Sequence, residues 1–109
     1  MHEILRRLDM DARVLDLGCA AGSFRDDECS ATIIRADLEE TKGRFATRFV
    51  CCDASILPFP DKSFNAVILN HSLEHFHDPA AVLAEIKRIL RHPAYLYVAV
   101  PDASTLTDR

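Results

Sequence analysis

A short apolar run that leads directly into a loop of very small residues is the feature that most constrains the fold of this chain. This run spans residues 14–17 and is apolar except for Asp16, and the loop over residues 18–23 contains only Gly, Cys, Ala and Ser. A second, largely apolar run over residues 32–36 ends at Asp37, 19 positions after Gly18. In parallel α/β sheets this arrangement holds adenosine-containing ligands, because small residues let the backbone approach the ligand and the carboxylate accepts hydrogen bonds from ribose hydroxyls. The sequence therefore predicts an adenosine site on an α/β sheet.

Short apolar segments alternate with helical patterns along the rest of the chain. The expected strands are residues 13–17, 32–36, 48–52, 65–70 and 95–100, and their continuous hydrophobicity is typical of strands covered on both faces. Residues 1–8 favour a short helix, and the short spans on either side of residues 32–37 predict stunted helices there. We expect one domain over residues 1–109. Its predicted fold is an open, largely parallel sheet of about five strands flanked by helices.

The clearest helical pattern follows Asp78. Asp78 is a favoured N-cap residue, and Pro79 suits the first helical position. One apolar face follows at helical spacing, made by Val82, Ile86, Ile89 and Leu90. The helix is expected to end before Pro93, because the residue preceding a proline is pushed out of the α region.

Composition and charge argue against several classes of function. The net charge is −4 and basic residues adjoin at most in pairs, which disfavours nucleic acid as the partner, because phosphate contacts need clustered Lys and Arg. No apolar run approaches the roughly 20 residues that span a bilayer, and the N-terminus has no signal-peptide core. The 4 cysteines show no CxxC spacing, so we expect reduced thiols and a cytoplasmic protein.

Four stretches carry a resemblance to a known family. They are residues 14–22, where an acidic residue precedes spaced small residues; Asp37; residues 52–59, which read Cys-Asp-Ala-Ser-Ile-Leu-Pro-Phe; and residues 63–79, which end in Leu-Glu-His-Phe-His-Asp-Pro. In this order they resemble class I S-adenosylmethionine-dependent methyltransferases, specifically the small-molecule group typified by ubiquinone-biosynthesis enzymes. The resemblance implies a Rossmann-like fold and transfer of a methyl group from S-adenosylmethionine to a small-molecule acceptor.

The resemblance also implies a set of cofactor-binding residues, which are Asp16, Gly18, Ala20, Gly22, Asp37, Leu38, Asp53, Ala54 and Asn70. Asp16 and the loop after it would hold the methionine end, together with Asn70. Asp37 would bind the ribose, with Leu38 packed on the adenine. Asp53 and the Ala54 backbone would contact the amino edge of the adenine. The aspartates also have a structural interpretation, in which they cap turns or bond the backbone of the loop.

A nicotinamide cofactor is the nearest alternative, because it uses the same strand, loop and acidic residue. That site normally requires G-x-G-x-x-G, whereas this chain has Gly18, Ala20 and Ser23 at the three positions. The third glycine allows close packing of helix on strand, so serine there disfavours this alternative.

Three histidines follow the fourth predicted strand. If the acceptor is a hydroxyl, a general base would help, and we assign this catalytic role to His71, with His75 and His77 as the other candidates. His75 resembles a recurring family histidine whose role is structural. No further ligands occur at convincing spacing for a metal. The segment that begins at Asn70 also differs from the Asn-Pro-Pro-Tyr pattern of amino-directed DNA methyltransferases.

The sequence departs from the family after the main helix and at its end. Residues 91–94 lack the Pro-Gly-Gly turn common in the family, so a different path is expected there. Asn65 replaces the usual aspartate before the fourth strand. The resemblance implies another helix and two last strands beyond the fifth, so we expect a C-terminally truncated domain whose open fifth strand self-associates or pairs with a partner. The alternative function is a non-catalytic S-adenosylmethionine-binding or interaction domain.

Overall fold

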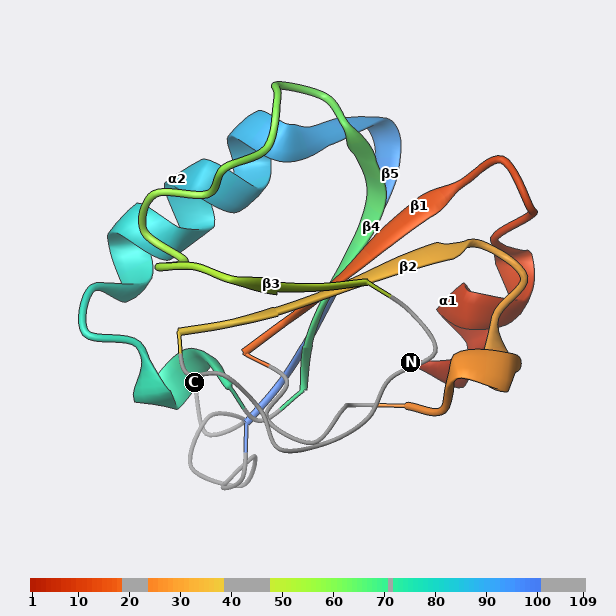
Figure 1. Ribbon diagram of the computed structural model, residues 1–109, viewed down its shortest axis with the longest axis horizontal. Coiled ribbons are helices and arrows are strands. Elements are labelled where there is room, and N and C mark those ends of the chain that lie inside the picture. The colour runs from red at the N-terminus through yellow and green to blue at the C-terminus, as the bar shows by residue number, and fades with distance from the viewer. Residues whose placement is uncertain (19–23, 39–47, 71, 101–109) are drawn as a thin grey trace, which may run out of the picture.

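A five-stranded, entirely parallel sheet forms the centre of the computed structural model, which describes residues 1–18, 24–38, 48–70 and 72–100. The strands lie in the order β3-β2-β1-β4-β5 (Figure 1). Their bounds are Arg13–Leu17 for β1, Thr32–Asp37 for β2, Arg48–Cys51 for β3, Phe64–Asn70 for β4 and Leu90–Ala99 for β5. The predicted α/β class and parallel sheet are thereby confirmed.

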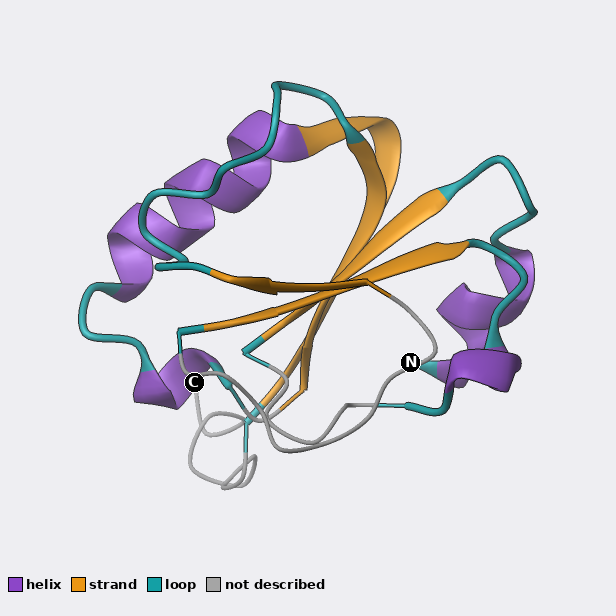
Figure 2. Ribbon diagram, viewed as in Figure 1, coloured by secondary structure: helices purple, strands orange, loops and turns teal. Residues whose placement is uncertain are grey.

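Helices cover both faces of this sheet (Figure 2). Helix α2, Pro79–Ile89, lies on one face, and helix α1, His2–Arg7, lies on the other with the 3-10 helix η1, Asp26–Glu28. A second 3-10 helix, η2, spans Leu73–His75. Between β1 and β2 the described residues contain no helix longer than η1, and the span in which a second stunted helix is predicted, residues 39–47, lies outside the described residues.

Alternate residues of the central strands divide the core into two layers. Leu15 and Leu17 of β1 face α2, together with Ile34, Ala36, Val67 and Leu69, and they pack against Val82, Ile86 and Ile89. Val14 faces the other way, with Ile33, Ala66 and Ile68, and packs against Leu5, Leu8 and Phe24. Because β-strand side chains alternate, Asp16 and Arg35 belong to the α1 face. This alternation decides where the charged residues of the strands point.

The beginning of α2 agrees with its sequence, and its end shows how the chain reaches β5. Asp78 accepts a hydrogen bond from the Ala81 N–H at 3.2 Å, and Pro79 occupies the first turn. After Ile89 the backbone becomes extended at once, so β5 begins earlier than the predicted residue 95. Regular pairing with β4 nevertheless starts at Tyr95, because residues 91–94 form an irregularity opposite a single residue of β4. The chain thus enters β5 without a glycine turn.

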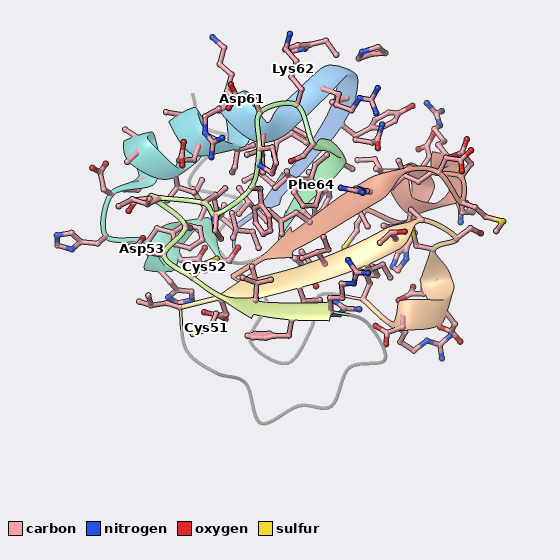
Figure 3. The ribbon with its side chains drawn as sticks, turned by 45° about the horizontal axis from the view of Figure 1, so that its top comes forward. Cys51, Cys52, Asp53, Asp61, Lys62 and Phe64 are labelled. Carbon is pink, nitrogen blue, oxygen red and sulfur yellow. The ribbon has the colours of Figure 1, made fainter. Side chains whose placement is uncertain are left out.

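Arg88 fastens the long segment between β3 and β4 to α2. Its guanidinium donates to the carbonyls of Phe59 and Leu57, at 2.8 and 3.0 Å, and pairs with the carboxylate of Asp61 at 2.8 Å. Glu85 completes the set by bonding Arg88 Nε and accepting from the Leu57 N–H, both at 2.8 Å. Figure 3 shows Asp61 and Lys62 where this segment turns back toward β4. The segment between β3 and β4 is therefore held against α2 through residues 57–61, in the part that precedes β4.

Asn65 connects the beginnings of two strands. Its side-chain oxygen accepts a hydrogen bond from the Arg13 N–H at 2.8 Å, so asparagine retains a polar contact at this position without a charge.

None of the helices within the described residues has the length and hydropathy needed to cross a membrane.

We predict that Ile86→Ala lowers the free energy of unfolding by ~2–5 kcal/mol, because a fully buried side chain is replaced by a cavity. Urea denaturation followed by circular dichroism measures this change. Leu83→Ala on the same helix is the matched control, since Leu83 is 39% exposed, and its effect is expected below ~1 kcal/mol. Equal losses in the two variants would contradict the layered core.

Candidate functional site

A cavity of about 440 Å³ lies at the carboxyl ends of the strands. It is bounded by residues 17 and 18 at the end of β1, 37 and 38 at the end of β2, 52–55 after β3, and 72 with 75–78 after β4. Val82 of α2 closes one side. Figure 3 shows Cys52 and Asp53 in the segment that leaves β3. In open parallel sheets, ligands bind at this edge, near the point where the strand order reverses. Here the reversal falls between β1 and β4.

A glycine is required at position 18 by the backbone conformation there and by the side chains packed around it. Its φ of +67° lies in the left-handed region, and its N–H donates to the Ala36 carbonyl at 2.8 Å. A Cβ at this position would lie 2.7 Å from the Cβ of Ser72, whose hydroxyl donates to the Leu17 carbonyl at 2.9 Å. The end of β4 therefore packs directly on the turn that follows β1, and only glycine fits between them.

Asp37 and Leu38 stand at the end of β2, where the sequence predicted a ribose-binding carboxylate. Asp37 is partly buried, and one of its oxygens accepts the Leu38 N–H at 2.7 Å. The Asp37 carbonyl accepts from the Cys52 N–H at 2.9 Å, which joins the ends of β2 and β3. Leu38 is 66% exposed although it is apolar and borders the cavity. The cavity thus has a carboxylate beside an exposed apolar surface.

Asp53 caps a turn and also borders the cavity. One carboxylate oxygen accepts both the N–H and the hydroxyl of Ser55, at 2.9 and 2.7 Å. The backbone donor first, and the hydroxyl second, hold the pKa of the Asp53 carboxyl below its usual range. Ala54 is buried under the same turn. The structural role left open by the sequence is therefore real, and it keeps an anionic acceptor at the cavity.

The cavity also contains residues that sequence analysis did not assign to the cofactor. Burial raises the pKa of the Cys52 thiol to about 11, so it remains protonated at neutral pH. His75 and His77 border the cavity as well, and His75 Nε2 lies 3.4 Å from a Glu74 carboxylate oxygen. The described residues contain no group of three His, Cys, Asp or Glu side chains arranged to hold a metal.

The remaining predicted residues lie elsewhere or outside the described part of the chain. Asp16 is fully buried on the α1 face and forms an ion pair with Arg35. Neither Asp16 nor Asn70 is among the described residues that border the cavity, although Asn70 ends the adjacent strand β4. Ala20, Gly22 and His71 lie outside the described residues. Sequence analysis missed Arg35, whose only signal was a charge within an otherwise apolar strand.

The Methyltransferase domain family matches residues 15–98, and this chain belongs to that family. The chain is 35% identical over 91 residues to the ubiquinone/menaquinone biosynthesis C-methyltransferase UbiE of Desulfotalea psychrophila. This alignment covers 72% of this chain and 37% of that protein. It is 30% identical over 109 residues to the demethylmenaquinone methyltransferase of Renibacterium salmoninarum, covering 86% of this chain and 46% of that protein.

A solved structure with bound ligands is also similar. It is the 1,6-didemethyltoxoflavin-N1-methyltransferase of Burkholderia thailandensis, with 1,6-didemethyltoxoflavin and S-adenosylhomocysteine. The TM-score is 0.64 at 30% identity, over 78% of this chain and 44% of that one. This chain spans less than half the length of each of these three proteins.

We predict that Gly18→Ala destabilises the chain by at least ~1–2 kcal/mol, the cost of a left-handed conformation for a residue with a side chain. The crowding against Ser72 adds to this cost. Thermal unfolding measures the effect. Ala84→Gly, on the exposed side of α2, controls for a glycine–alanine exchange, and its cost is expected to be ~1 kcal/mol. A Gly18→Ala variant as stable as the parent would contradict the described turn.

We predict that Ser55→Ala raises the pKa of Asp53, because it removes one of the two donors that stabilise the carboxylate. The pKa remains below the usual value, since the backbone donor of residue 55 is retained. Carbon NMR titration of the aspartate carboxyls measures it. Ser63→Ala removes a hydroxyl that bonds the Pro60 carbonyl instead, and it should leave the titration of Asp53 unchanged. An unaltered Asp53 pKa in Ser55→Ala would refute the assignment.

Proposed function

We propose that the cavity binds S-adenosylmethionine and that this chain is the cofactor-binding part of a methyltransferase that acts on a small molecule. One observation carries the proposal: a glycine without room for a side chain and two carboxylates from neighbouring strand ends surround one cavity. These residues are Gly18, Asp37 and Asp53. Membership of the methyltransferase family supports the same cofactor, as does the S-adenosylhomocysteine in the Burkholderia protein.

The described side chains suit the adenosine half of this cofactor. The carboxylate of Asp37 accepts hydrogen bonds from the ribose hydroxyls, and the ionised carboxylate of Asp53 accepts from the adenine amino group. Leu38 and Ala54 supply the apolar contact for the adenine ring. The exposure of Leu38 is then a feature of the site, because base binding would cover it.

The methionine half is assigned to the turn after β1 and to the end of β4. Gly18 brings its backbone to the cavity, and Ala20, Gly22 and Asn70 remain predicted contacts. Asp16 is assigned an indirect role, because its carboxylate is enclosed on the opposite face of the sheet from α2. This differs from direct binding of the cofactor by Asp16.

The bound cofactor supplies an electrophilic methyl group on a sulfonium. The chain contributes mainly the orientation of the reactants, which lowers the activation free energy by ~7–11 kcal/mol where the reacting atoms are well aligned. His71 is our candidate base for an acceptor hydroxyl, and His75 and His77 place two further imidazoles at the same cavity. The related proteins are named for methylation of demethylmenaquinone and of 1,6-didemethyltoxoflavin. A small-molecule acceptor is proposed here by that likeness.

Two further assignments concern the surroundings of the domain. The described cysteines, Cys29, Cys51 and Cys52, are free thiols, which supports a reducing compartment and the cytoplasm as the location. At the outer edge of the sheet, Leu96 and Val98 of β5 are 44% and 41% exposed. We assign this edge to pairing with another strand, including self-association, because an exposed apolar edge strand is a template for pairing.

We predict that wild-type protein binds S-adenosylmethionine and S-adenosylhomocysteine, and that Asp37→Ala weakens both affinities. The expected loss is ~1–3 kcal/mol, or about 5- to 150-fold, for a hydrogen-bond partner removed from the ribose. Isothermal titration calorimetry measures both constants. Asp11→Ala removes an exposed carboxylate at the opposite end of β1 and should change neither. Unchanged affinity in Asp37→Ala would show that the ribose assignment is wrong.

Transfer of a labelled methyl group separates catalysis from cofactor binding alone. Turnover by this chain supports a complete catalytic site within these 109 residues. Cofactor binding without turnover, by this chain and by any longer form, supports the alternative of a non-catalytic binding domain. Absence of any adenosine ligand would leave only a structural module.

A further inference from the structure

Arg35 carries a positive charge into the core beside the turn that follows β1. Its side chain is 1% exposed, and it lies on β2 directly opposite Asp16 of β1 in the parallel register. Asp16 is itself fully buried. Buried arginines are rare and are usually held by several partners, because an uncompensated charge in the core is strongly destabilising.

The contacts of Arg35 reach both sides of residues 19–23. On the preceding side, Nη1 forms an ion pair with the carboxylate of Asp16. On the following side, Nη2 donates to the carbonyl of Phe24 and to the carboxylate of Asp26, each at 2.7 Å. The guanidinium carbon also lies 4.7 Å from the centroid of the Phe24 ring, within cation–π range. One side chain thus joins β1, β2 and the beginning of η1.

We propose that Arg35 is a positioning residue for S-adenosylmethionine, acting as a clamp on the two chain segments that flank residues 19–23. The inference rests on the proposed function. In this arrangement Asp16 acts through Arg35, and its carboxylate fixes the guanidinium that holds Phe24 and Asp26.

The geometry favours positioning of the methionine end over a general contribution to stability. The clamp joins Asp16, two positions before Gly18, to Phe24 and Asp26, so it fixes the separation of these described residues. The Gly18 N–H bonds Ala36, the neighbour of Arg35, which ties the same turn to the same strand. Asp37, two residues after Arg35, is joined instead to the segment after β3, because its carbonyl accepts from the Cys52 N–H. Loss of the clamp should therefore affect the methionine end more than the adenosine end.

Arg35→Lys tests this separation. Lysine retains the buried positive charge, but its single ammonium does not reproduce the fork that reaches both flanking segments. We expect affinity for S-adenosylmethionine to fall by about tenfold or more, as for loss of a charge-assisted hydrogen bond. Affinity for adenosine, which lacks the methionine, should change by less than about twofold. Calorimetry with the two ligands measures both constants well below the unfolding temperature.

Two companion variants make the result decisive. Asp26→Ala removes one contact of Arg35 to the segment after residue 23 and leaves the contact to the Phe24 carbonyl. Because the Asp26 side chain is 29% exposed, this variant should fold even if Arg35→Lys does not, and it should show a smaller loss with the same selectivity. Ile86→Ala destabilises the domain from the other face and should leave the ratio of the two affinities unchanged.

The outcomes distinguish this inference from the proposed function. Unchanged S-adenosylmethionine affinity in Asp26→Ala and in any folded Arg35→Lys, or an equal loss for adenosine, overturns the clamp. If the wild-type protein binds neither S-adenosylmethionine nor adenosine, the proposed function is overturned instead.

Discussion

The parallel register of β1 against β2 is the constraint on which the rest of the structure depends. It sets Asp16 opposite Arg35, and it lets the Gly18 N–H reach the Ala36 carbonyl one step further on. The next residue of β2 is Asp37, so the same register brings that carboxylate to the edge where β1 turns. A slip by one residue would exchange the two faces of β2, exposing Arg35 to the α2 layer and burying Ile34 and Ala36 on the wrong side.

Three aspartates at the ends of neighbouring strands have three different environments. Asp16 points away from α2 and is neutralised by a buried guanidinium. Asp37 ends its strand partly buried and bonds the next backbone N–H. Asp53 lies in an exposed turn and is kept ionised by Ser55. Their sequence contexts are similar, but the alternation of side chains and the lengths of the strands give them distinct chemical roles.

Sequence analysis predicted the strands and the main helix well, and it was wrong where tertiary pairing overrides local preference. The beginning of α2 follows from Asp78 and Pro79 alone, since capping is a local interaction. The early beginning of β5 does not, because Leu90 already pairs with Phe64 of β4, and the polar, proline-containing residues 91–94 form an irregularity before regular pairing resumes at Tyr95. The predicted residues Asp37, Leu38, Asp53 and Ala54 do border one cavity. Cys52 joins them as the neighbour of Asp53 after β3, whereas His75 and His77 reach the cavity in the segment that follows β4.

The amino-acid sequence by itself determined the α/β class, the order of the strands along the chain and the turn of small residues that begins at Gly18. These depend on hydrophobic periodicity and on small or capping residues, which act over a few neighbouring positions. Only the tertiary structure decided that Asp16 pairs with Arg35 and that Gly18 has no space beside Ser72. It also decided which side chains surround the cavity. These contacts join residues far apart in the chain, and their existence depends on strand register and face, which no local pattern specifies.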